Sequence, residues 1–323
     1  MLSESIANPR SISVAEFLNT APEELGLELI AGGDGLETNE LRSERIQKLG
    51  LGLAGYSSYI HYGRLQMIGK SETAFLQGFS PEERADVVSS LPSENIACLL
   101  ITKGLEPIEE VTAFAERHKI PLLRSGAVSS RAIALITSFL QDRLAPETTI
   151  HGVLVEMHGL GVLIRGESGI GKSECALDLV ARGHRLISDD SVRIKSLGGT
   201  LVGSSNEITA GFLEIRGLGI INVRELFGVA SVRSSKELSV CIEFRRSEEQ
   251  MEGDRFGLEM ETEEICGSRL PKYSLPVRPG RNLASLVETA VKVYMLRCEG
   301  SDAAKEVLER HSRALASEGK VAS

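Results

Sequence analysis

Two patterns of apolar and polar residues alternate in the first half of the 323-residue chain. Short apolar runs are separated by longer stretches in which apolar residues recur every three or four positions, a pattern typical of strands that alternate with amphipathic helices. Such alternation favours βαβ units and a mostly parallel sheet. The expected strands span 25–30, 64–68, 96–102 and 121–124, and the expected helices span 37–49, 71–76, 81–91 and 108–118.

A longer helical pattern at 129–144 ends at the polar, proline-containing stretch 145–149. Proline and short polar residues end helices, so we expect a domain boundary here. Near the C-terminus, apolar residues again recur at helical spacing from Leu283, which predicts a packed helix. The expected divisions are an N-terminal α/β domain over 1–130, a connecting helix and linker over 131–149, and a C-terminal domain over 150–323 that ends in helices.

The most informative run follows an apolar strand predicted at 160–164. It reads Gly166-Glu167-Ser168-Gly169-Ile170-Gly171-Lys172-Ser173, the G-x-x-x-x-G-K-S pattern of a phosphate-binding loop. Glycines let successive backbone N–H groups point at one anion, and a helix pattern over 174–182 supplies a helix N-terminus for the same anion. Lys172 adds a cation, and the Ser173 hydroxyl suits Mg²⁺. The run therefore predicts a site for nucleotide phosphates and magnesium.

Two acidic residues, Asp189 and Asp190, follow the strand predicted at 185–188. Ligands of open α/β sheets bind at the carboxyl ends of strands, so a functional carboxylate is expected here. Because neighbouring strand residues point to opposite faces, we expect only one of the two to face the phosphates.

Charged residues also interrupt apolar or rigid segments further along. Glu214 and Arg216 lie in the glycine-punctuated run 213–223, where burial without partners is costly. A bound cation would compensate Glu214 and a phosphate or a carboxylate would compensate Arg216, but a mutual contact or a surface strand accounts for them equally well. The run 276–281, Pro-Val-Arg-Pro-Gly-Arg, is a rigid loop whose arginines suit phosphate recognition, although its spacing alone leaves this open.

Bulk composition narrows the class of protein. The net charge of −9 argues against a general nucleic-acid binder, which needs a concentrated basic surface. The sequence lacks an apolar stretch of the roughly 18 residues that a membrane span needs, and its N-terminus does not resemble a signal peptide. The five cysteines are widely spaced, which favours free thiols in a reducing cytoplasm.

Taken together, the motifs resemble the HPr kinase/phosphorylase family, bacterial enzymes that phosphorylate and dephosphorylate a serine of the phosphocarrier protein HPr. The resemblance covers most of 151–282, and it includes HGVLVEMHGLGVLIRGESGIGKSE, RGHRLISDDSV, LEIRGLGIINVRELFG, DRFGLE and LPVRPGRN. The first half resembles the family's N-terminal domain less specifically, through LAGYSSY and IPLLRSG. The implied fold is α/β, with an N-terminal βαβ-type domain and a C-terminal P-loop kinase domain similar to phosphoenolpyruvate carboxykinase.

The resemblance also implies roles for individual residues. Asp190 would accept the serine proton in the kinase direction and serve the reverse chemistry. Ser173 and Glu214 would ligate Mg²⁺, and the loop Pro276-Val277-Arg278-Pro279-Gly280-Arg281 would serve mainly dephosphorylation. The implied catalytic residues are His151, Lys172, Asp190 and Arg255.

The implied reaction uses ATP and Mg²⁺, and its reverse uses inorganic phosphate and releases pyrophosphate. The implied partner is HPr or a paralogous phosphocarrier, and family members form hexamers that control carbon metabolism. The segment RSERIQKLGLGLAGY departs from the arginine-proline-glycine stretch expected before LAGY, which bears on regulation and assembly. Two alternatives remain open at this point: a P-loop kinase of a small metabolite, and a non-catalytic nucleotide-sensing regulator.

Overall fold

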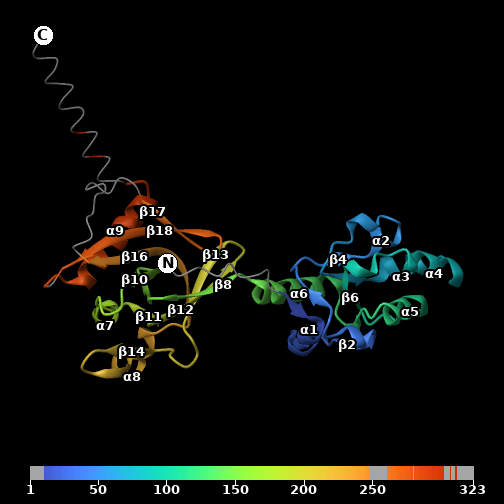
Figure 1. The fold of residues 1–323 in the computed structure, drawn as a ribbon, viewed down its shortest axis with the longest axis horizontal. Coiled ribbons are helices and arrows are strands. Elements are labelled where there is room, and N and C mark those ends of the chain that lie inside the picture. Colours follow the sequence, from blue (N-terminus) through green and yellow to red (C-terminus); the bar gives the residue numbers. More distant parts are fainter. Residues whose placement is uncertain (1–10, 247–259, 279, 302–305, 307–309, 311–323) are drawn as a thin grey trace, which may run out of the picture. The chain divides into compact units, whose positions relative to one another are not determined.

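The computed structural model describes residues 11–246, 260–278, 280–301, 306 and 310 (Figure 1). The chain divides into two compact units, Met1–Pro146 and Glu147–Ser323. No helix within the described residues combines the length and the apolar character that a membrane span needs.

The N-terminal unit is built on a mostly parallel sheet, as the alternating pattern predicts. Its strand order is β2-β7-β6-β5-β4, and only the β2–β7 pair is antiparallel. Strand β6 is buried along its whole length, which explains its continuous apolar run. The strands are β2 (Glu28–Ala31), β4 (Gln47–Lys48), β5 (Arg64–Ile68), β6 (Ile96–Ile101) and β7 (Leu122–Arg124).

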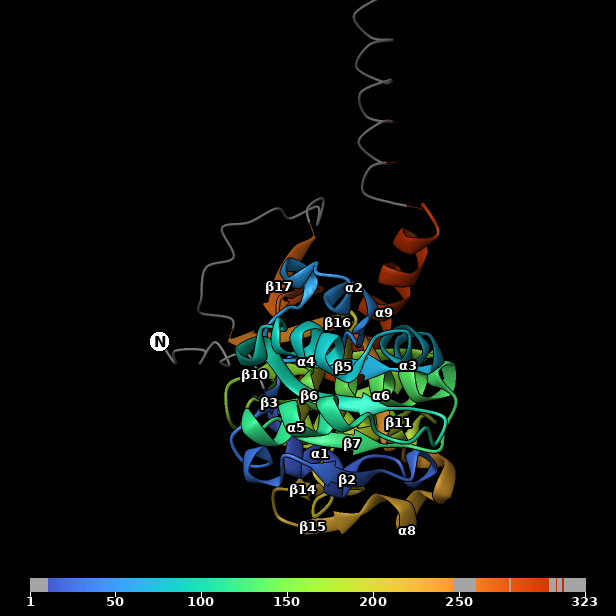
Figure 2. The ribbon, with the colours of Figure 1, turned by 90° about the vertical axis from the view of Figure 1, so that its right-hand side faces the viewer.

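Helices cover both faces of this sheet. One core cluster joins one face of the sheet to the four helices α2–α5, and a second cluster joins the other face to α1 and α6. Figure 2 shows several of these helices together with β5, β6 and β7. The helices are α1 (Val14–Thr20), α2 (Gly50–Leu53), α3 (Lys70–Gln77), α4 (Pro81–Ser89), α5 (Glu109–Arg117) and α6 (Ser129–Leu144).

The helix predicted at 37–49 is wrong. The chain instead forms β3 (Glu40–Leu41), which pairs with β1 (Ile12–Ser13), and then the edge strand β4. The apolar residues of this segment are too sparse to form a helical stripe. Pairing with neighbouring strands therefore outweighs local helix propensity.

The segment 131–149, expected to connect the domains, is divided between the two units. Helix α6 packs into the N-terminal core through Ala132, Ile136 and Leu140. The polar stretch after it enters strand β8 (Glu147–His151), which pairs with β12 (Ser191–Leu197) in the C-terminal sheet. A half-buried edge strand carries few apolar residues, which is why the sequence pattern did not reveal it.

The C-terminal unit contains a larger mixed sheet with the order β11-β9-β10-β16-β13-β12-β8. Strands β9 and β10 pair antiparallel and form a hairpin that leads into the run 166–173. The long strand β16 pairs in parallel with both β10 and β18, and β17 pairs with β18. The strands are β9 (Val153–Met157), β10 (Leu160–Gly166), β11 (Arg185–Ser188), β12 (Ser191–Leu197), β13 (Thr200–Ser204), β16 (Ser235–Arg246), β17 (Glu261–Ile265) and β18 (Ser268–Val277).

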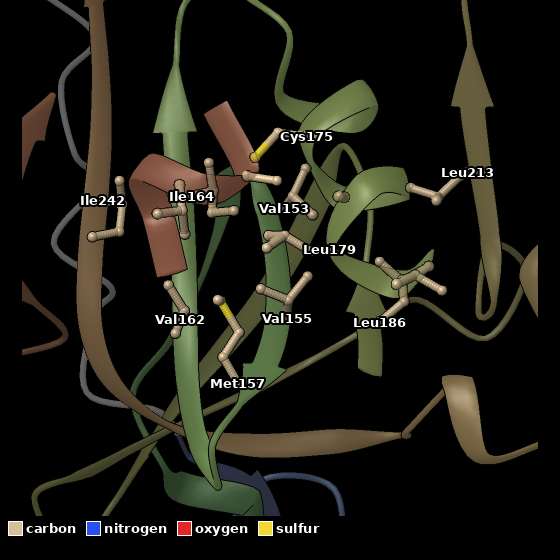
Figure 3. Packing of buried hydrophobic residues seen from close by; sticks show 14 of the residues in the cluster. Val153, Val155, Met157, Val162, Ile164, Cys175, Leu179, Leu186, Leu213 and Ile242 are labelled. Carbon is tan, nitrogen blue, oxygen red and sulfur yellow. The ribbon is translucent and has the colours of Figure 1, made fainter. Parts of the chain in front are cut away.

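Two helices, α7 (Lys172–Ala181) and α9 (Leu283–Cys298), pack on one face of this sheet. Side chains of β9, β10 and β16 meet those of α7, among them Val155, Ile164 and Leu179 (Figure 3). Most of the predicted stripe of α9 is confirmed: Val287 and Val291 are buried in the same core, and Leu283, Ala290 and Tyr294 pack against it, together with Ala284, which the pattern did not include. The small hairpin of β14 (Phe212–Ile215) and β15 (Gly219–Asn222) and the short helix α8 (Val223–Phe227) complete this unit.

Candidate functional site

The glycine loop, residues 166–173, joins β10 to α7, so the predicted order of strand, loop and helix is confirmed. Gly166, Gly169 and Gly171 have φ angles of 145°, 74° and 102°, which other residues rarely adopt. At Gly166 an added Cβ would lie 2.8 Å from the carbonyl oxygen of Phe244 in β16. Among the described residues, no side chain caps the first N–H groups of α7. These donors are therefore available to an anion.

Lys172 is buried inside the curve of this loop. Its Nζ donates to the carbonyl oxygens of Gly166 and Glu167, each at 2.9 Å. Burial lowers the pKa of Lys172, while the charges of Asp190 and Asp189 act in the opposite direction. The ammonium group therefore lies where the glycine loop would hold the outer phosphates, with two carboxylates close enough to act on it.

Asp189 connects the glycine loop to the strand β14. Its Oδ1 accepts a hydrogen bond from the Ser173 hydroxyl at 3.0 Å, and its Oδ2 accepts one from the Glu214 N–H at 3.1 Å. Burial raises the pKa of Asp189, although these hydrogen bonds oppose the shift. The expected set of site residues does not include Asp189. The signal that could have revealed it is the half-buried Ser173 hydroxyl, which needs an acceptor such as the carboxylate that follows β11.

Asp190 and His151 form a second pair beside the loop. The Asp190 Oδ1 lies 3.0 Å from the His151 Nδ1, and both side chains are exposed. Strand pairing brings them together, because His151 is the register partner of Ser191 and the Gly152 N–H donates to the Asp190 carbonyl at 3.0 Å. Two residues that lie far apart in sequence therefore meet at the glycine loop.

The expectation that only one of the two carboxylates faces the phosphate site stays a prediction, although the extended strand that it assumed is absent here: β11 ends at Ser188 and Asp190 has a left-handed φ of 63°. This backbone conformation turns Asp190 to His151 while Asp189 contacts Ser173. Both carboxylates act on Lys172.

Glu214 and Arg216 are exposed rather than buried, which agrees with the surface-strand interpretation of this run. The backbone of Glu214 contacts Asp189, whereas its side chain lies on the exposed side of β14. Arg216 lies against the glycine loop, since a Cβ added to Gly169 would be 2.6 Å from a guanidinium nitrogen. The structure therefore adds Arg216 to the cations beside the loop.

The arginine loop, residues 276–281, runs from the end of β18 to the start of α9. Arg278 and Arg281 are exposed, and the Arg281 N–H donates to the Arg278 carbonyl at 3.2 Å. At the start of α9, Leu283 faces the glycine loop, where a Cβ added to Gly171 would be 3.3 Å from it. Pro279 of this loop and the predicted catalytic Arg255 lie outside the described residues.

A cavity of about 430 Å³ opens between the glycine loop and the end of β16. Its lining includes His151, Glu167 and Arg246, and the Arg246 Nε lies 2.9 Å from a Glu167 carboxylate oxygen. The cavity therefore borders both the predicted phosphate loop and the His151–Asp190 pair.

The oxygen donors at the loop fit a magnesium ion. Within the described residues there is no group of three His, Cys, Asp or Glu side chains that would enclose a metal. Proteins usually hold Mg²⁺ through one or two carboxylates together with substrate phosphates and water, so a closed cage is not required. The Ser173 hydroxyl and the Asp189 carboxylate, already in contact, are hard oxygen donors of this kind.

Comparisons with known proteins agree along nearly the whole chain. Models of the HPr Serine kinase N terminus and the HPr Serine kinase C-terminal domain match residues 12–140 and 142–311. An HPr kinase/phosphorylase of Geobacter sulfurreducens is 45% identical over 304 residues, which are 94% of this chain and 95% of the relative. An HPr kinase/phosphorylase of Clostridium botulinum is 41% identical over 308 residues, covering 95% and 99%.

Among solved structures, the Hpr(Ser) kinase/phosphatase from Coxiella burnetii matches 50% of this chain and 98% of its own, with 37% identity and a TM-score of 0.46. The two domain models together with relatives above 40% identity over nearly full length establish the relationship. The chain is a member of the HPr kinase/phosphorylase family.

Proposed function

We propose that this chain uses ATP and Mg²⁺ to phosphorylate a serine of HPr, or of a paralogous phosphocarrier, and that it removes the phosphate by phosphorolysis. The relatives that match it over nearly their full length carry the name of this enzyme. The observation that carries the proposal is the His151–Asp190 pair beside Lys172 at the glycine loop. A small-metabolite kinase and a non-catalytic regulator have no comparable support.

In the kinase direction, the glycine loop and Lys172 hold the β- and γ-phosphates of ATP. Asp190 accepts the proton of the attacking serine hydroxyl, and its contact with the His151 Nδ1 orients the carboxylate. Arg216, beside Gly169, meets the charge that develops on the transferred phosphoryl group. Arg255 is proposed for the same purpose from the resemblance.

In the reverse direction, inorganic phosphate occupies the glycine loop and one of its oxygens attacks the phosphorus of phosphoserine. The bond between phosphorus and the serine oxygen breaks as Asp190 takes the proton of the attacking hydrogen phosphate and passes a proton to the serine oxygen. The products are pyrophosphate and free serine. The arginine loop, residues 276–281, supports this direction by adding Arg278 and Arg281 to the cations near the phosphates.

Ser173, Asp189 and Glu214 are proposed to hold Mg²⁺. When bound, the ion neutralises phosphate charge. The P-loop kinase fold of the C-terminal unit, an assembly or regulatory role for residues 1–130, a hexamer and a cytoplasmic location belong to the same proposal.

A two-direction assay with purified full-length protein tests this function. One reaction contains HPr, Mg²⁺ and γ-labelled ATP, and the other contains serine-phosphorylated HPr and inorganic phosphate. We expect label on an HPr serine in the first and pyrophosphate release in the second. Transfer without pyrophosphate release would limit the function to a kinase, and absence of both reactions despite ATP binding would contradict the proposal.

A further inference from the structure

A polar cluster outside the phosphate site joins the end of α7 to the start of α9. The guanidinium of Arg182 donates to the Ser285 hydroxyl at 3.0 Å, the Glu288 carboxylate at 2.8 Å and the Asn282 side-chain oxygen at 3.1 Å. The His184 Nε2 lies 2.9 Å from the other carboxylate oxygen of Glu288. Arg182 and His184, which directly follow α7, therefore contact the first two turns of α9.

The cluster is not needed to keep α9 on the sheet. Ala284, Val287 and Val291 are completely buried in the core, and apolar burial supplies most of the association between helix and sheet. Apolar contacts are non-directional, however, and do not by themselves determine where a helix begins. Hydrogen bonds to a planar guanidinium do define such geometry.

The contact with Asn282 acts on the first residue of this helix. Asn282 is the N-cap of α9, because its side-chain oxygen also accepts a hydrogen bond from the Ser285 N–H at 2.8 Å. Arg182 therefore contacts the N-cap oxygen and the two side chains that follow it on the same helix face. Removing these contacts frees the cap to shift while the buried part of α9 stays in place.

The start of α9 lies between two parts of the proposed active site. Asn282 directly follows Arg281, the last residue of the arginine loop, and Leu283 faces Gly171 of the glycine loop. The other end of the arginine loop is fixed independently, since Val277 of β18 pairs with Arg246 of β16. Besides the hydrogen bond from the Arg281 N–H to the Arg278 carbonyl and the packing of Leu283, the cluster around Arg182 thus restrains the end of the loop that carries Arg281.

We propose that Arg182, with His184 and Glu288, is a positioning cluster that fixes Arg281 relative to the glycine loop and thereby sets the balance between the two directions of phosphoryl transfer. The inference rests on the proposed function, in which the arginine loop serves mainly dephosphorylation. The glycine loop, Lys172 and Asp190 are held by other contacts, so the kinase direction depends less on this cluster.

The test compares Arg182→Lys and Glu288→Gln with wild-type protein in both reactions. Lysine keeps the charge but cannot contact Asn282, Ser285 and Glu288 together. We expect the kcat of phosphorolysis to fall about tenfold, because small misplacements of reacting groups are costly, and the kcat of the kinase reaction to fall by less than about twofold. The affinity for ATP should not change.

Arg233→Lys is the matched control. Arg233 makes a comparable pair with Glu156, at 3.1 Å to both carboxylate oxygens, but it has no contact with α9 within the described residues. We expect this variant to keep the wild-type ratio of the two rates. If Arg182→Lys does not fold, Ser285→Ala removes a single contact, and a smaller shift of the ratio in the same direction would support the cluster's role.

The outcomes separate the inference from the proposed function. Variants that lower both rates equally, or leave both unchanged, in an active wild-type background would overturn the positioning role alone. If the wild-type protein catalyses only the kinase reaction, there is no ratio of the two rates for the cluster to set. That result would overturn the inference but not the kinase activity. A wild-type protein without either reaction would overturn the proposed function and the inference with it.

Discussion

Each unit contains a parallel strand that turns through glycine into a helix, but the two helix starts differ. In the N-terminal unit, β5 leads through Gly69 into α3, and the Glu72 carboxylate accepts a hydrogen bond from the Gly69 N–H at 2.9 Å. In the C-terminal unit, β10 leads through the glycine loop into α7. There, in the part of the chain that the structure describes, no side chain caps the helix.

The difference indicates that the start of α3 is structural, whereas the start of α7 can receive an anion. At α3 an arriving anion would meet the buried carboxylate of Glu72, and the neighbouring hydroxyls of Thr102 and Ser129 already contact each other at 2.7 Å. At α7 it would meet uncapped N–H groups and Lys172. The same strand-to-helix topology therefore offers a site for an anion only where the chain leaves its donors unsatisfied.

The largest effect is expected from Lys172→Ala, which removes the cation at the start of α7. Both nucleotide affinity and phosphoryl transfer should fall, with kcat/KM lower by at least about a hundredfold, because preorganised charge is the main catalytic contribution in such sites. Binding titration and the kinase assay measure the two losses. Lys70→Ala is the control, since Lys70 is the first residue of α3; a similar loss there would contradict the comparison.

Asp190→Asn should separate binding from chemistry. The amide keeps the size of the side chain but cannot take the serine proton, so kcat should fall by roughly 10² to 10⁴. ATP affinity should stay near the wild-type value, because the glycine loop and Lys172 are unchanged. A rapid-quench transfer assay alongside a binding titration gives both values, and near-normal transfer would place the base on another residue.

Sequence patterns predicted the parts of this site that depend on local chemistry. The glycine loop, the strand before it and the helix after it follow from residue types at fixed spacing. Alternation of apolar runs with helical patterns likewise predicted most strands of the N-terminal sheet. Family resemblance implied a catalytic role for Asp190 and for His151, but their contact was not predicted, since it depends on the pairing of β8 with β12. Strand register is a long-range property that local patterns do not specify.

The failures have the same origin. The helix predicted at 37–49 gives way to two short strands whose partners lie elsewhere in the chain. The role of Asp189 was missed because the alternation rule holds only in an extended strand, whereas Asp190 has a left-handed backbone. In both cases tertiary pairing or a local backbone conformation overrides the sequence pattern.

A smaller effect, on stability rather than activity, is expected from Glu72→Ala. This variant removes the carboxylate that accepts a hydrogen bond from the Gly69 N–H at the start of α3, and loss of such a bond costs about 1 kcal/mol. Denaturant unfolding of the full chain should show a lower midpoint for the N-terminal unit, while both enzymatic rates remain at wild-type values. A fall in activity with unchanged stability would mean that α3 takes part in function and would contradict its description as a scaffold.

The smallest effect concerns a closed cluster inside the C-terminal unit, around Glu156 of β9. The carboxylate contacts Arg185, Arg233 and Lys236 at 3.1 to 3.7 Å. Burial tends to raise the pKa of Glu156, but Arg233 and Lys236 outweigh it and hold the pKa below its ordinary value of 4.5. The charge of Glu156 is thus balanced by side chains of its own unit, just as the Glu72 carboxylate at the start of α3 already has a partner in its own unit.

The pH dependence of stability tests this resemblance. A carboxyl group whose folded pKa is lowered stabilises the protein above its unfolded pKa, and this contribution is lost as the pH falls through the folded pKa. Glu156→Gln should therefore lower the free energy of unfolding by about 1 kcal/mol at pH 7 and by progressively less below pH 4.5, with both catalytic rates unchanged. A stability difference that persists undiminished at low pH would show that packing, rather than charge, makes the contribution of Glu156.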